Sequence, residues 1–130
     1  MDYKPNQKEI ASVSALKPFD RYQHMVKKVV DFEMAYTLTR ADGTWALASV
    51  EGNTLVSIWP AAVYSELSAV GEWQEYVPHA LSLHELMTTR LEAFEKNGFL
   101  INVFSINGKT GFVVNSNEFR ADLEEESENY

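Results

Sequence analysis

The sequence contains no cysteine. This absence excludes disulfides, thiolate zinc sites, iron–sulfur clusters and cysteine nucleophiles. Long apolar runs are also missing: no stretch approaches the roughly 18 to 20 residues of a membrane span, and residues 1–6 lack the apolar core of a signal peptide. We therefore expect a cytoplasmic protein that does not bind membranes.

The motifs of common catalytic and nucleotide-binding sites are absent as well. There is no Gly-x-Gly-x-x-Gly segment, no phosphate-loop lysine and no glycine-flanked serine elbow. His79 and His84 are five residues apart, whereas a helical metal pair needs a spacing of three or four. We expect no catalytic residue, no metal and no cofactor.

Positive charge is in short supply, with 11 lysines and arginines against 19 acidic residues and a net charge of −8. Residues 1–50 hold seven basic and six acidic groups (+1), residues 51–117 hold three and seven (−4), and residues 118–130 hold one and six (−5). A field of this sign repels nucleic acid and attracts a basic protein surface. We expect a basic protein partner, if any, and no nucleic acid.

What is present is a composition typical of one globular domain: 130 residues, of which 45% are hydrophobic. Apolar spacing of three and four predicts four longer helices. Their expected starts are Asn6 and Asp20, then Ser82 with Glu85 as a capping box, and Asn115 near the C-terminus. A short helix is expected from Pro60 to about Ser68, and residues 124–130 are expected to form a frayed acidic tail.

Alternating patterns predict the strands. Residues 34–58 are broken at 41–43 and 51–53 by hairpin-turn residues, which indicates three antiparallel strands. Residues 99–105 and a strand around 112–114 are joined at Asn107-Gly108-Lys109, which indicates a hairpin. The sequence thus predicts a single α+β domain over residues 1–130. Its mainly antiparallel sheet has about five strands, a three-stranded meander plus a hairpin, packed against two N-terminal helices, a central helix and a C-terminal helix.

Large aromatic residues gather between the end of the meander and the central helix, where residues 72–79 read as an irregular loop. Clustered tryptophan and tyrosine bury large areas with few rotamers, so they suit a protein-binding surface. The other interpretation is that the two tryptophans there pin an irregular connection to the core. The candidate binding residues are Trp59, Tyr64, Glu72, Trp73, Glu75, Tyr76 and His79.

Two functional classes follow from this segment. The first is a non-enzymatic binding or regulatory module, including an immunity-type protein, in which Glu66, Glu72 and Glu75 around the aromatic residues select a basic partner. The alternative is a small-molecule sensor or enzyme with an apolar pocket near the same aromatic residues, where Glu72 and Glu75 could act as acid and base. Either a monomer or a homodimer is compatible with the sequence.

A series of short motifs runs along residues 19–125. They are Arg21-Tyr22, Val29-Val30-Asp31, Asp42-Gly43, Trp59-Pro60 with Tyr64, Trp73 with Tyr76-x-Pro78, Leu83 to Leu86, and Val103-Phe104. The order of these motifs resembles domain-of-unknown-function family 2750, a family of small bacterial proteins. The resemblance implies the order of the fold elements and a bacterial cytosolic origin, and it carries over no catalytic residue.

Overall fold

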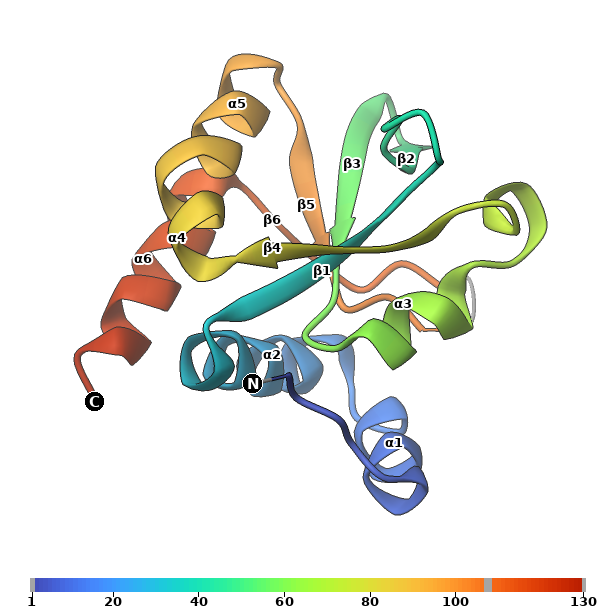
Figure 1. The fold of residues 1–130 in the computed structure, drawn as a ribbon. Coiled ribbons are helices and arrows are strands. Elements are labelled where there is room, and N and C mark those ends of the chain that lie inside the picture. Colours follow the sequence, from blue (N-terminus) through green and yellow to red (C-terminus); the bar gives the residue numbers. More distant parts are fainter. Residues whose placement is uncertain (1, 107–108, 130) are drawn as a thin grey trace.

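The structure is a computed structural model that describes residues 2–106 and 109–129. Two helices open the chain, as expected (Figure 1). The side chain of Asn6 accepts the backbone N–H of Glu9 at 2.8 Å and starts α1 (Gln7–Ser14). Helix α2 (Pro18–Phe32) has proline at its first position, where no helical N–H is required. It therefore starts two residues before the predicted Asp20.

The strands form two sheets. Strand β1 (Met34–Thr39) pairs antiparallel with β4 (Val77–Ser82) in a two-stranded sheet. The second sheet has the order β2-β3-β5-β6, and only its β3–β5 pair is parallel. Its strands are β2 (Leu47–Val50), β3 (Asn53–Ile58), β5 (Leu100–Val103) and β6 (Phe112–Val114).

The predicted meander is wrong in one respect, because β1 does not continue the sheet of β2 and β3. The two sheets touch through isolated bridges, of which the most central joins Tyr36 and Trp59 by two backbone hydrogen bonds of 2.8 Å. Most of β1 pairs instead with β4, which the sequence analysis treated as loop. Proline has a low propensity for strands, so the presence of Pro78 argued against a strand here. The structure accommodates it because proline is tolerated in edge strands.

The predicted hairpin of β5 and β6 is present as an antiparallel pair. Its turn at residues 107–108 lies outside the described residues. The parallel pairing of β3 with β5 was missed, and it requires the long crossover that runs through residues 59–99. This crossover contains the whole predicted aromatic segment.

The central helix starts at its predicted residue but is not uniform. The side chain of Ser82 accepts the N–H of Glu85 at 3.0 Å and caps the helix. The Glu85 carboxylate binds Arg90 at 2.8 Å and does not reach back to Ser82. The helix runs as α4 (Leu83–Glu85), a wider π-helical turn η2 (Leu86–Arg90) and α5 (Leu91–Lys96).

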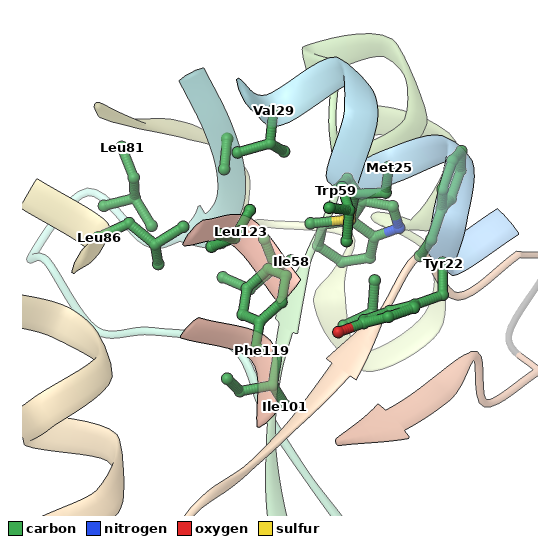
Figure 2. Packing of buried hydrophobic residues seen from close by; sticks show 14 of the residues in the cluster. Tyr22, Met25, Val29, Ile58, Trp59, Leu81, Leu86, Ile101, Phe119 and Leu123 are labelled. Atoms are coloured by element: carbon green, nitrogen blue, oxygen red, sulfur yellow. The ribbon is translucent and has the colours of Figure 1, made fainter. Parts of the chain in front are cut away.

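The core lies where the two sheets meet the long helices, as Figure 2 shows. Met25 and Val29 of α2 point toward Ile58 and Trp59, while Phe119 and Leu123 come from α6 (Ser116–Ser127). Helix α6 packs against α2 and α5 and continues to Ser127, past Glu124 where we expected the chain to fray. The α+β class, with mostly antiparallel strands, is confirmed. No helix in residues 2–106 and 109–129 has the length and apolar character of a membrane span.

Candidate functional site

Trp59 belongs to the core. It directly follows β3, its indole is fully buried, and its Nε1–H donates to the carbonyl oxygen of Ser105 at 2.9 Å. The backbone bridge to Tyr36 holds it in place between the two sheets. A partner could reach this ring only after the protein unfolds locally, so its expected role in a binding surface is wrong.

Tyr64 is equally inaccessible. It lies on α3 (Ala62–Ser68), and its ring meets Phe104 edge to face with centroids 4.6 Å apart. Its hydroxyl has no hydrogen-bond partner in the described chain, and burial raises its pKa. The expectation that Tyr64 belongs to a binding surface is also wrong. Tyr64 is buried in the core together with Trp59.

Glu72, Trp73, Glu75 and Tyr76 lie on the connection from α3 to β4, which projects from the body of the molecule on the side away from α6 (Figure 1). A short helical turn, η1 (Gly71–Trp73), forms its tip. Trp73 and Tyr76 are half-buried and pack against the margin of the core, whereas both glutamates are exposed. Four of the seven predicted residues therefore share one surface region.

The structure adds three apolar residues to this region that the sequence analysis missed. Leu67, Val70 and Val77 are 51%, 58% and 55% exposed. Of the seven large apolar side chains that are exposed in the described chain, these three fall within eleven consecutive positions. We refer to Leu67, Val70, Trp73, Tyr76 and Val77 as the α3–β4 patch.

Charge surrounds this patch unevenly. Glu66, Glu72 and Glu75 are exposed, and none of them forms an ion pair among the described residues. On the β1 side, the guanidinium of Arg40 lies 5.0 Å from the centre of the Tyr76 ring and covers one of its faces. The apolar residues are thus accompanied by three exposed carboxylates along the projecting connection and by one guanidinium on the β1 side.

His79 lies on β4 opposite Thr37, two residues after Val77 and on the same face of the strand. Its exposed ring is 6.1 Å from that of Trp45, which also meets Phe94 edge to face at 5.7 Å. The guanidinium of Arg90 lies over Trp45 at 5.0 Å. His79 therefore belongs to a second aromatic group built around Trp45, a residue that sequence reasoning placed in a strand without a function.

The α3–β4 connection offers exposed apolar area together with exposed carboxylates. No group of three histidine or carboxylate side chains in residues 2–106 and 109–129 is placed to hold a metal ion. Trp73 and Tyr76 line none of four surface hollows of the described chain.

A polar cluster that the sequence did not reveal lies under the N-terminal segment. The Tyr3 hydroxyl donates to the Glu9 carboxylate and lies 3.2 Å from Nε2 of His24. Burial, and then the bond to Glu9, raise the pKa of Tyr3, while burial and the nearby Lys28 lower the pKa of His24. Because Tyr3 is itself buried, this cluster fastens the N-terminal segment to α2.

The comparisons with known proteins agree with the motif order. A family model described as "Protein of unknown function (DUF2750)" matches residues 22–123. The chain belongs to this family. No curated protein matches it. The resemblance inferred from the sequence is therefore confirmed, and the DUF2750 match assigns neither an activity nor a partner.

Proposed function

We propose that this DUF2750 protein is a non-enzymatic, cytoplasmic bacterial module that binds a basic protein through the α3–β4 patch. Its role is regulatory, and an immunity-type protein that covers a basic effector is one form of it. The observation that carries the proposal is the concentration of exposed apolar side chains at Leu67, Val70 and Val77. Concentrated apolar exposure of this kind is typical of a surface that another protein covers.

The shape and chemistry of the patch favour a protein over a small ligand. The patch lies on the projecting connection between α3 and β4 (Figure 1), and its residues line none of the four surface hollows described above. Trp73 and Tyr76 are half-buried, and aromatic side chains of this kind have few rotamers, which suits a contact anchor. The exposed apolar groups around them supply area that water leaves on association.

The charge of the patch selects the partner. Exposed Glu66, Glu72 and Glu75 have no cationic partner in the described chain, and the whole molecule carries a net charge of −8. Rim charges of one sign speed the encounter with an oppositely charged surface, and their effect falls as salt is added. A contact of this kind is weak to moderate and responds to ionic strength.

The test is capture from the native cytosol with three tagged forms of the chain. The first is the natural sequence and the second carries Leu67→Ser and Val70→Ser. The third is a matched control, Leu47→Ser, which removes an exposed apolar side chain from β2. We expect a basic protein to bind the first and third forms at low salt and to be lost from the second.

The captured protein is then purified and its affinity is measured for each form. A loss of about tenfold or more confined to the Leu67/Val70 form supports the patch, since such a loss corresponds to about 1.4 kcal/mol. Equal affinity for all three forms overturns the proposal. A partner that is acidic, or that binds equally well at high salt, contradicts the role of the carboxylates.

A further inference from the structure

Residues 2–5 form a non-helical arm that leads into α1 from beside α2 (Figure 1). Among the described residues, no backbone hydrogen bond joins this N-terminal arm to the rest of the chain. Of its four side chains, Tyr3 alone is buried. A half-open hollow of about 110 Å³ lies between the arm and the start of α3, at Ala62 and Val63. The arm is therefore held mainly by one side chain, and a segment with so few contacts opens at a small cost in free energy.

Side chains of α1 and α2 form the socket that holds Tyr3. The Tyr3 ring stacks on Phe32 with centroids 5.4 Å apart, and the ammonium of Lys28 lies 5.0 Å from the ring centre. Its hydroxyl donates to the carboxylate of Glu9 and lies 3.2 Å from Nε2 of His24. A phenol has a single hydroxyl proton, so the proton in the contact with His24 belongs to the imidazole. We refer to Glu9, His24, Lys28 and Phe32 as the Tyr3 socket.

His24 is the member of the socket whose ordinary pKa lies near neutral pH. Burial is the main cause that lowers its pKa, Lys28 one turn further along α2 lowers it too, and Glu9 acts in the opposite direction. Asp20, one turn earlier on α2, is exposed, so water screens its charge. Asp20 and Lys28 are on the same helix as His24 and stay beside it whether or not the arm is bound. The arm therefore changes mainly the burial of the imidazole.

Two further aromatic groups complete the surroundings of His24. The Phe104 ring, which follows β5, has its centroid 6.4 Å from that of the imidazole and carries no charge. Tyr64 of α3 is buried, and its hydroxyl interacts with that of Tyr3. Burial raises the pKa of both tyrosines, so both phenols are neutral over the range in which His24 titrates. A proton added to the imidazole is thus a new charge among uncharged rings, next to Lys28.

We propose that the N-terminal arm is a pH-sensitive strap, and that protonation of His24 releases Tyr3 from its socket. With the arm bound, the imidazolium is half-buried beside the ammonium of Lys28, and the attraction of Glu9 offsets only part of this cost. Release hydrates the imidazole, so the proton binds the released state more tightly than the bound state. The arm is held above the ordinary histidine pKa of about 6.5. As pH falls below this value, the opening equilibrium rises by at most about tenfold per pH unit.

Release exposes a surface that the bound arm covers. Phe32 loses the ring that stacks on it, and the buried hydroxyl of Tyr64 loses the neighbouring Tyr3 hydroxyl. Ala62 and Val63, at the start of α3, lose the arm residues that face them across the hollow. The strap therefore controls access to the start of α3. It does not depend on the α3–β4 patch, which begins at the other end of this helix.

The first test is a proton NMR titration of the His24 ring in the full chain and in Tyr3→Ala. Removal of the phenol hydrates the imidazole, so we expect the pKa of His24 to be higher in Tyr3→Ala than in the natural chain. Each unit of difference corresponds to a tenfold change in the opening equilibrium. The ring of His84, exposed on α4, is the internal control and should titrate alike in both chains. An equal or lower His24 pKa in Tyr3→Ala would overturn the proposal.

The second test follows the arm itself by limited digestion with chymotrypsin between about pH 7.5 and about pH 5.5. Cleavage after Tyr3 requires its ring to leave the socket. The cleavage rate, divided by that of a free peptide of residues 1–9 at the same pH, therefore reports the population of the released arm. We expect this ratio to rise as pH falls below about 6.5, by at most about tenfold per pH unit. Mass spectrometry identifies the product.

Two glutamine variants separate His24 from general effects of pH. Glutamine keeps an amide donor near the position of Nε2 but does not titrate. In His24→Gln the ratio should stay constant with pH, whereas in the matched control His84→Gln it should rise as in the natural chain. A constant ratio in the natural chain, or the same rise in His24→Gln, would overturn the proposal. Val70→Ser changes only the α3–β4 patch and should leave the response unaltered, so the strap and the patch can fail independently.

Discussion

The two ends of the aromatic segment differ in what their side chains do, although in sequence they look alike. At the first end, Trp59 and Tyr64 are fully buried and each contacts the segment that follows β5. At the second end, Trp73 and Tyr76 are half-buried on a projecting connection beside exposed apolar residues. Large aromatic residues in a sequence therefore indicate where a large side-chain area is buried. The fold alone decides whether the protein's own core or a binding partner covers that area.

The largest expected effect is at the buried end. Trp59→Ala should destabilise the protein by about 3–5 kcal/mol, because it leaves a cavity and removes the donor to the Ser105 carbonyl. Chemical denaturation followed by circular dichroism measures the change. A loss below about 1 kcal/mol would contradict the core position of this ring.

Trp73→Ala should have an intermediate effect. The ring is only half-buried against the margin of the core, so about 1–2 kcal/mol of stability should be lost. The same denaturation experiment applies, with binding of the captured partner measured in parallel. A loss of stability as large as that caused by Trp59→Ala would indicate that Trp73 is a core residue and not part of the proposed patch.

Tyr64→Phe should change the free energy of unfolding at neutral pH by less than about 1 kcal/mol in either direction, because the buried hydroxyl makes no hydrogen bond of ordinary geometry and interacts with the hydroxyl of Tyr3 near it. Burial raises the Tyr64 pKa above its unfolded value of about 10. Below about pH 10 the tyrosine is protonated in both the folded and the unfolded state, so it does not reduce the free energy of unfolding. Above that pH the unfolded state loses its proton first, and the free energy of unfolding of the natural protein falls.

The Phe variant should lose less stability than the natural protein as pH rises above about 10. Urea denaturation at neutral and alkaline pH compares the two. A clear loss of stability at neutral pH in Tyr64→Phe would indicate that the hydroxyl has a partner after all.

The smallest effect on stability is expected at the exposed end. Val70→Ser should change the free energy of unfolding by no more than about 0.5 kcal/mol, because Val70 is 58% exposed. Thermal unfolding provides the measurement, with Leu47→Ser as control. A substantially lower melting temperature for Val70→Ser alone would show that this side chain supports the fold.

Local signals in the sequence predicted most of the elements. The caps at Asn6, Ser82 and Asn115 start helices where predicted, because each side chain accepts a backbone N–H three residues on. The two sheets and the β3–β5 pairing could not be predicted from local signals, since strand partners are set by contacts between distant segments. Strand β4 was missed for the same reason. Proline is compatible with a strand that lies at the edge of a sheet, and the sequence does not show that the strand containing Pro78 is such an edge.

Four of the candidate residues, Glu72, Trp73, Glu75 and Tyr76, lie together on the α3–β4 connection. Burial could not be assigned to each aromatic residue of the segment from spacing alone. Trp59 directly follows the nearly continuous apolar run Leu55-Val56-Ser57-Ile58, which was a usable signal of a strand buried on both faces. Trp73 and Tyr76 follow Gly71 in irregular structure, where no periodicity reports burial.

Acrylamide quenching of tryptophan fluorescence tests the division of the aromatic segment most directly. One chain keeps only Trp59, with Trp45→Phe and Trp73→Phe, and the other keeps only Trp73, with Trp45→Phe and Trp59→Phe. We expect blue-shifted, weakly quenched emission from Trp59 and red-shifted, more strongly quenched emission from Trp73. Equal quenching of the two, or stronger quenching of Trp59, would contradict the division into a core anchor and a surface patch.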